Sequence, residues 1–162
     1  MTAIRFEGAS AARPLPALRQ ALLQPGSTTH NLGGIIICPS NPYLSVDPIL
    51  AIPGMRDLLR SAGVPVVAVS PIVAGQAIKG PTAKIMGELG LPSDAIAVAR
   101  HYRGLIEGFV LDATDANLQD RVDIPVHVTN TIMRTLDDKI QLAEACIAFC
   151  GRLRADKGTK AP

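Results

Sequence analysis

Two apolar segments, each ending in a polar turn that contains proline, place the strongest constraint on this sequence. The first, Gly33 to Cys38, contains three consecutive β-branched isoleucines and predicts a buried, central strand. Pro39-Ser40-Asn41-Pro42 follows it and ends regular structure, because its prolines lack amide donors. The second segment, Val64 to Val69, has the same form and ends at Ser70-Pro71. Since ligands bind at the carboxyl ends of parallel strands, the two turns predict the two walls of one cleft.

Composition narrows the class of protein. Of the 162 residues 48% are hydrophobic, and no apolar run reaches the roughly 18 residues of a membrane span, which predicts one globular domain with its own core. A net charge of +2 and 3% aromatic residues give little support for nucleic-acid binding. Three cysteines without paired spacing fit a reducing compartment, and no signal-peptide pattern is present, so we expect a cytoplasmic protein. Cys146 and Cys150 are expected to pack in the core rather than bind a metal.

Strands alternate with helices along the chain. Besides the two segments above, the patterns predict strands at residues 4–7, 108–112 and 125–129. They predict helices at residues 15–22, 53–62, 82–89 and 93–103, a short helix or turn at 115–121, and a helix from residue 136 onward. Residues 24–31 are read as a polar loop, 42–53 as irregular or extended, and 71–80 as a glycine-rich linker. This alternation predicts a three-layer, Rossmann-like α/β fold with a mainly parallel sheet and flanking helices.

The last helix carries its own signals. Thr135 is expected to cap it, with Asp138 three residues on in a capping-box position, just as Ser93 is expected to cap the helix at 93–103. An apolar stripe is predicted at residues that follow helical spacing, namely Leu136, Ile140, Ala143 and Ile147. We expect an α/β domain over residues 1–150 and a frayed, basic tail over 151–162.

The first turn offers hydrogen-bonding groups. Ser40 and Asn41 have short polar side chains held between two rigid prolines. They can contact a ligand, or they can form a tight turn that merely ends a strand.

The residues after the second strand have the chemistry of a phosphate site. Ser70 supplies a hydroxyl, Gly75 and Gly80 allow close backbone approach, and Lys79 adds a positive charge ahead of a helix that opens at Pro81. The alternative is a solvated lysine in a surface loop. Neither a P-loop nor a G-x-G-x-x-G spacing is present.

Other polar residues are weaker candidates. Asp47 and Asp112 lie near expected strand ends, where carboxylates can hold Mg²⁺, but each alone is more often a turn or cap residue. His127 fits a satisfied strand histidine, and His30 and His101 show no partner in the sequence. A third polar strand end, Thr129-Asn130-Thr131, is expected to border the same cleft.

Four blocks of sequence add a family resemblance. They are residues 37–42 (ICPSNP), 48–54 (PILAIPG), 67–73 (VAVSPIV) and 77–81 (AIKGP). Their order and spacing resemble the carboxyl-terminal half of the 2-phospho-L-lactate transferase family, and the resemblance runs from residue 4 to the last helix. It implies transfer of a phospholactyl-type group from a guanylyl diphosphate donor to the deazaflavin Fo. In that reaction GMP is released, Mg²⁺ is required, and the product is the precursor of coenzyme F-420.

The resemblance also implies what this chain lacks. Family members are about twice as long, and their glycine-rich phosphate-binding turn, metal ligands and Fo contacts lie in an amino-terminal half with no counterpart here. No catalytic or metal-binding residue is therefore carried over. The expected substrate-binding residues are Ser40, Asn41, Ser45, Ser70, Gly75, Lys79 and Gly80.

Three readings follow from this sequence. The leading one is part of a transferase, either a homodimer or paired with a separate amino-terminal half. The second is a non-catalytic module that binds a phosphometabolite or nucleotide, and the third is a partial chain without a function of its own.

Overall fold

The computed structural model describes residues 3–23 and 32–159, and a sheet of four parallel strands forms its centre. The strands are β1 (Ile35–Ile37), β2 (Val66–Val69), β5 (Gly108–Asp112) and β6 (Val126–Thr129), in the order β1-β2-β5-β6. Ile36 pairs with Val67, Ala68 with Phe109, and Val110 with His127. The predicted α/β fold with a parallel sheet is confirmed.

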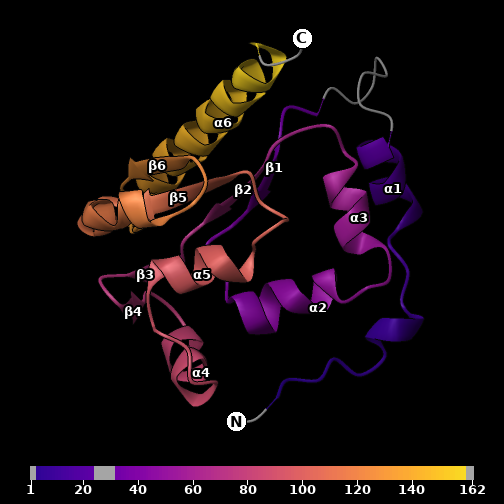
Figure 1. Ribbon diagram of the computed structural model, residues 1–162, viewed down its shortest axis with the longest axis horizontal. Helices are drawn as coiled ribbons and strands as arrows, with labels where there is room; N and C mark the ends of the chain where they lie inside the picture. The colour runs from indigo at the N-terminus through magenta and orange to yellow at the C-terminus, as the bar shows by residue number, and fades with distance from the viewer. Residues whose placement is uncertain (1–2, 24–31, 160–162) are drawn as a thin grey trace.

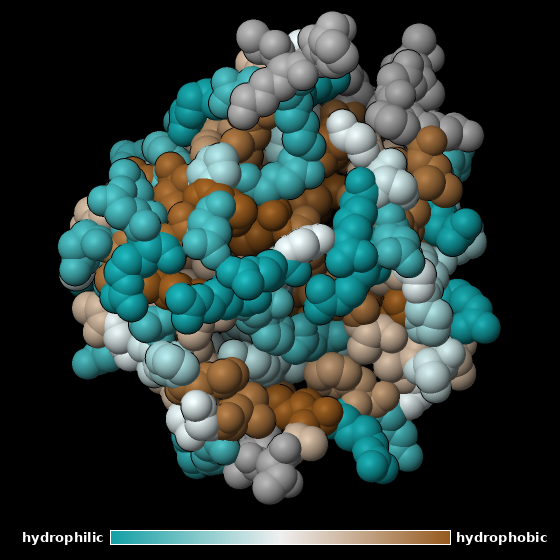
Figure 2. Space-filling model, viewed as in Figure 1, coloured by the Kyte–Doolittle hydropathy of each residue, from teal (hydrophilic) through white to brown (hydrophobic). Residues whose placement is uncertain are grey.

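Helices cover both faces of this sheet (Figure 1). On one face, α2 (Asp47–Leu50), α3 (Met55–Arg60) and α5 (Ala95–His101) share a hydrophobic core with the strands. Two further helices extend this layer: α1 (Pro16–Leu23) packs against α3, and α4 (Thr82–Glu88) packs mainly against segments outside this sheet. The other face packs against α6 (Leu136–Thr159), and its strand residues there are Val67, Val69 and Val110. Figure 2 shows hydrophobic side chains near the centre of the view, where the strands meet the helices, framed by hydrophilic ones. None of the helices within residues 3–23 and 32–159 has the length and apolar character that crossing a membrane requires.

The prediction that β1 is central was wrong. The central strands are β2 and β5, whose residues are all buried, whereas β1 pairs with β2 alone in the described sheet. Ile36 of β1 is 37% exposed. An apolar run signals burial, but it does not say which strands will flank it.

Residues 42–53 are helical for the most part, which corrects the irregular segment expected there. Pro42–Val46 forms a π-helical turn, η2, and α2 follows directly. Asn41 starts the turn, because its Oδ1 accepts hydrogen bonds from the amides of Tyr43 (3.0 Å) and Leu44 (3.1 Å). Pro42 and Pro48 lie at the first positions of their helices, where no amide donor is needed.

The segment after β2 is also more regular than predicted. Instead of a linker, β3 (Ile72–Val73) and β4 (Gln76–Ala77) form a small antiparallel ribbon, and Ala74 and Gly75 turn between them with positive φ. Residues 4–7 form no strand, and a short 3-10 helix, η1 (Ala9–Ala11), follows them. The helix expected after β5 is confirmed as a 3-10 helix, η3 (Ala113–Arg121).

Two helix caps were predicted, Ser93 for α5 and Thr135 for α6. The cap of α5 is Asp94, whose Oδ1 accepts from the amide of Ala97 at 2.7 Å, and not Ser93. The capping box of α6 is confirmed, because the amide of Asp138 donates to Thr135 Oγ1 and the amide of Thr135 donates to Asp138 Oδ2.

The body of α6 differs from its prediction in two ways. The predicted stripe is exposed, and Leu136 and Ile147 are 70% and 64% accessible to solvent. The buried side chains come from an adjacent face, namely Leu142, Cys146, Phe149, Cys150 and Leu153. The helix also continues to Thr159, so the fraying expected beyond residue 150 is wrong as far as the described residues extend. The division into a domain and a tail stays a prediction.

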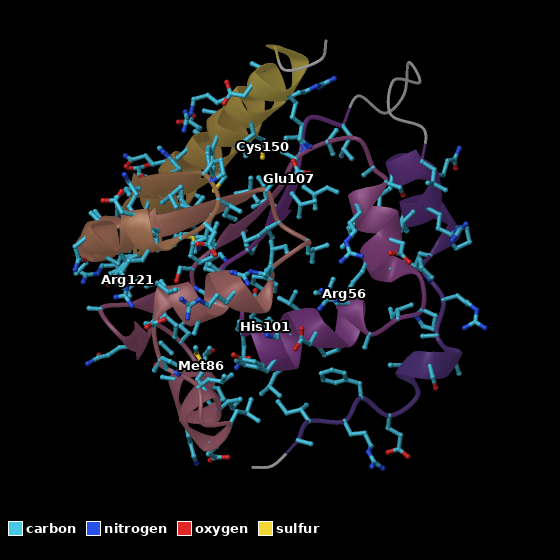
Figure 3. The ribbon with its side chains drawn as sticks, in the orientation of Figure 1. Arg56, Met86, His101, Glu107, Arg121 and Cys150 are labelled. Atoms are coloured by element: carbon cyan, nitrogen blue, oxygen red, sulfur yellow. The ribbon has the colours of Figure 1, made fainter. Side chains whose placement is uncertain are left out.

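The two cysteines of α6 confirm the expected core role. Cys146 and Cys150 are buried against the sheet, and Figure 3 shows Cys150 on the side of α6 toward the strands. Burial, together with the nearby thiols of Cys150 and Cys38, raises the pKa of Cys146 to about 11. A thiol with so high a pKa is almost fully protonated near neutral pH and therefore unreactive.

Candidate active-site wall

The residues that follow three of the four strands line one hollow at the carboxyl edge of the sheet. Its volume is about 120 Å³, and it is lined by Pro39, Ser70, Pro71, Ile78, Lys79, Thr131, Met133 and Lys139. Pro39 follows β1, Ser70 follows β2 and Thr131 follows β6. The two proline turns therefore meet at one hollow, and Thr131 borders it as expected for the third polar strand end.

The size of this hollow limits what it can hold. Pockets that bury a whole drug-sized ligand measure about 300–1,000 Å³. A hollow of about 120 Å³ accommodates the anionic end of such a ligand, and the remainder must contact other surfaces.

The first turn contributes less to the hollow than the sequence predicts. Ser40, Asn41 and Ser45 are not among its lining residues. The side-chain oxygen of Asn41 is used to start η2, and its Nδ2 is buried with no hydrogen-bond partner among the described residues. Ser45 lies within η2, where its amide donates to the carbonyl of Asn41.

Ser70 lines the hollow and also shapes its wall. Its side chain is almost fully buried, and its Oγ donates to the carbonyl of Ile72 at 2.8 Å and accepts from the amide of Ile72 at 3.2 Å. The hydroxyl proton is thereby committed to the turn into β3. Ser70 fixes the direction in which the chain leaves β2.

Gly75 and Gly80 lie outside the hollow, on either side of the strand that leads to Lys79. Gly75 is at the tip of the ribbon, where its carbonyl accepts from Ser93 Oγ and the neighbouring amide of Ala74 donates to the carboxylate of Asp115. Gly80 has a φ of 70°, which lets the chain turn into α4. The predicted phosphate site relied on the dipole of the helix after Gly80. Because α4 has only seven residues, this dipole is weak.

Lys79 is the sequence-predicted residue that keeps a free functional group at the hollow. It is exposed, it lines the hollow, and it forms no ion pair within residues 3–23 and 32–159. The sequence also missed one cation there, Lys139, the fourth residue of α6. No pattern within α6 marks it, because the contact depends on how α6 packs.

Asp112 holds the strand ends together beneath the hollow. Its Oδ1 accepts from the amide of Thr114, and its Oδ2 accepts from the amide (2.8 Å) and Oγ1 (2.9 Å) of Thr131. Burial alone would raise the pKa of Asp112, but these hydrogen bonds outweigh it and hold the pKa below its ordinary value. The charged carboxylate of Asp112 therefore fixes Thr131, and this contact holds the end of β6 beside the end of β5.

Asp47, the second predicted Mg²⁺ ligand, also contacts another side chain. Asp47 Oδ1 lies 2.8 Å from His101 Nε2, and Figure 3 shows His101 on α5 facing α2. This contact gives His101 the partner that the sequence did not reveal, with the ring of Tyr43 packed at 4.8 Å. No group of three or more metal-binding side chains occurs among the residues that the structure describes. The carboxylates of this part of the chain do not fit a complete Mg²⁺ site.

His127 also has a structural partner. Its Nδ1 accepts from Arg152 at 3.2 Å, while burial, and then the charge of Arg152, lower the pKa of His127. This agrees with the satisfied strand histidine that was expected. His30 lies outside the described residues.

Comparison with known proteins gives this geometry a context. Residues 4–143 match the family model described as 2-phospho-L-lactate transferase CofD. The 2-phospho-L-lactate transferase of Methanocaldococcus jannaschii is 40% identical over 119 residues, which cover 74% of this chain and 38% of that protein. The phosphoenolpyruvate transferase of Streptomyces griseus is 36% identical over 152 residues, 91% of this chain and 46% of that protein.

A third relative repeats the pattern of partial coverage. The 2-phospho-L-lactate transferase of Methanococcus maripaludis strain S2 is 41% identical over 115 residues, which cover 71% of this chain and 37% of that protein. The chain thus spans less than half the length of these curated relatives. The chain belongs to the 2-phospho-L-lactate transferase CofD family.

Proposed function

We propose that this chain forms the carboxyl-terminal wall of a transferase in coenzyme F-420 biosynthesis. The observation that carries the proposal is the hollow at the carboxyl edge of the sheet, which is lined by residues that follow three strands and by Lys79, a cation without an ion-pair partner among the described residues. Family membership supplies the reaction class.

The proposed reaction moves a phospholactyl-type group from a guanylyl diphosphate donor to the deazaflavin Fo. The hydroxyl oxygen of Fo forms a bond to the phosphorus that carries the lactyl group, the bond to the bridging oxygen breaks, and GMP leaves. Lys79 binds a donor phosphate and stabilises its negative charge. The residues lining the hollow include no carboxylate, so the base that takes the hydroxyl proton comes from elsewhere.

The proposed reaction also needs a donor group and a metal ion. The relatives are named for phospholactate in Methanocaldococcus and for phosphoenolpyruvate in Streptomyces, so either group is a candidate for the donor. The Mg²⁺ of the proposed reaction would be bound by ligands other than Asp112, whose two oxygens accept hydrogen bonds, and Asp47, whose Oδ1 contacts His101. It would neutralise charge on the donor phosphates.

A chimera tests the proposal. The matching stretch of the Methanocaldococcus jannaschii transferase is replaced by this chain, and the product is assayed with Fo, donor and Mg²⁺ by chromatography. We expect activity in the chimera and its loss or strong reduction when the chimera carries Lys79→Ala. A folded chimera that binds Fo and donor but forms no product would contradict the transferase function.

This chain by itself is expected to give no product in the same assay, since it spans less than half the length of its curated relatives. Robust turnover by the isolated chain, at enzyme concentrations equal to the substrates, would show that one wall is sufficient.

A non-catalytic module that binds a phosphometabolite or nucleotide is the second candidate. It is favoured by the full engagement of Asp112, since no free carboxylate is then available at the hollow among the described residues to act as a base. Binding of GDP by the isolated chain, combined with an inactive chimera, would favour this reading over the transferase.

A further inference from the structure

The hollow at the carboxyl edge holds a second positive charge that comes from a distant part of the sequence. Lys79 follows β4, whereas Lys139 is on α6, and both line the same hollow. Like Lys79, Lys139 is exposed and forms no ion pair with any residue in the described ranges. Two free ammonium groups therefore share one small hollow.

No carboxylate is among the described residues that line the hollow. Asp112 is turned toward Thr114 and Thr131, and Asp138 Oδ2 accepts from the amides of Arg134 and Thr135. Neither aspartate lines the hollow. The other polar side chains that line the hollow are the hydroxyls of Ser70 and Thr131.

Lys139 is poorly placed for the stability of its own helix. It is the fourth residue of the 24-residue α6, near the amino-terminal end, where the helix dipole disfavours a cation. The acidic residues of that turn, Asp137 and Asp138, follow the ordinary rule. A residue that breaks a local rule without a local partner is expected at a functional position.

We propose that Lys139 binds anionic substrate together with Lys79, and that the pair selects a diphosphate over a single phosphate. The proposal rests on the proposed function, because it assigns the diphosphate of a nucleotide-type donor to this hollow. Two ammonium groups carried by different elements contact oxygens of two linked phosphates, whereas a monophosphate gives fewer charge-assisted contacts. A hollow of about 120 Å³ matches a diphosphate end without its nucleoside.

Calorimetric titration of the full chain with inorganic pyrophosphate and with inorganic phosphate, at fixed ionic strength, tests this inference. The wild type should prefer pyrophosphate. Lys139→Ala should weaken pyrophosphate binding about ten- to a hundredfold, the loss of one charge-assisted contact, and should reduce the preference over phosphate. Lys139→Arg should retain most of the affinity.

Lys84→Ala is the matched control, because Lys84 is an exposed lysine on α4 that lies outside the hollow. It should bind pyrophosphate like the wild type. Thermal unfolding of Lys139→Ala should be unchanged or occur at slightly higher temperature, since a cation leaves the amino-terminal end of α6.

Three outcomes would overturn the inference. They are wild-type affinity in Lys139→Ala, an equal loss in Lys84→Ala, and a wild type that does not bind pyrophosphate. None of them decides the transferase function, which the chimera tests separately. Conversely, an inactive chimera beside a pyrophosphate preference that depends on Lys139 would keep the binding site and remove the reaction.

Discussion

Substitution of Lys79 is the most direct test of the proposed function. Its ammonium lines the hollow without a partner among the described residues, so its role rests on an anionic ligand. Lys79→Ala should weaken GDP binding about ten- to a hundredfold and leave unfolding unchanged. Calorimetry with Lys84→Ala as control measures this. Equal affinities of wild type and Lys79→Ala would remove Lys79 from the site.

Asp112 makes a prediction about stability and pH. Its carboxylate is buried and charged, and it accepts three hydrogen bonds from Thr114 and Thr131. Its lowered pKa means that it adds stability above the ordinary carboxyl pKa of about 4, and that this stability is lost as the pH falls through the folded-state value. Asp112→Asn should lower the free energy of unfolding at pH 7 by about 1–3 kcal/mol.

Urea unfolding at pH 7 and at pH 3 checks the sign. The difference between wild type and Asp112→Asn should be largest at pH 7 and shrink at pH 3. Asp57→Asn is a control, since Asp57 is exposed on α3. A difference that stays constant with pH would show that Asp112 acts through its shape and not its charge.

The sequence predicted part of the lining of the candidate hollow, because polar turns after apolar strands are local patterns. Ser70, Lys79 and Thr131 were expected at the cleft, and all three line the hollow. Asn41 and Gly75 have local roles that short polar and glycine residues fill equally often. Lys139 was out of reach, because it depends on the packing of α6 against strands more than 25 residues away in sequence.

Among the elements, α6 lies unusually close to β5. An added Cβ at Gly108 would lie 2.7 Å from Leu153 Cδ1 and 2.7 Å from Phe149 Cε1. Gly108→Ala should therefore push α6 away from the sheet and destabilise the fold by about 1–3 kcal/mol. Gly151→Ala, with open space around its Cβ, should stabilise by about 0.5–1 kcal/mol through helix propensity. Thermal unfolding of the two variants measures both effects.

This pair of glycines separates packing from propensity. Both changes add one methyl group, and they differ in what the methyl group meets. If Gly108→Ala were as stable as the wild type, α6 would be able to shift without loss of contact.

The sequence predicted most strands correctly, because β-branched runs bounded by breakers have few alternatives. It failed where two patterns compete. In α6, apolar side chains occur on adjacent faces, and spacing alone favoured Ile140 and Ile147 over the buried Leu142 and Phe149. In residues 42–53, prolines suggested an irregular or extended chain, although Pro42 and Pro48 fit the first positions of helices.

At the scale of the whole molecule, the exposed side of β1 and α6 forms an apolar surface. Ile36, Ile140 and Ile147 are exposed there, and a hollow of about 370 Å³ lined by Ile36, Ile147 and Arg154 lies among them. No strand within the described residues pairs with the outer edge of β1. An open edge and apolar surface favour association, so we expect the chain to form dimers or larger species.

Light scattering over a range of concentrations measures this association. Ile147→Lys should reduce it without loss of thermal stability, because the side chain is 64% exposed. Lys84→Ile, far from this surface on α4, is a control for general hydrophobicity. A compact wild-type monomer at every concentration would contradict the prediction.

The strand order has a consequence for how the chain folds as it is synthesised. Each strand pairs with the strand that precedes it in the sheet order β1-β2-β5-β6, so each one emerging from a ribosome finds its neighbour already made. One face of the sheet is covered late. Its residues Val67, Val69 and Val110 are buried by α6, which is the last of the described elements to be synthesised. During translation that face stays bare until about residue 153 has been added. If translation stalls before that point, the nascent chain exposes apolar valines and is prone to aggregate. Chaperones that bind exposed valine-rich strands would then be needed to keep it soluble.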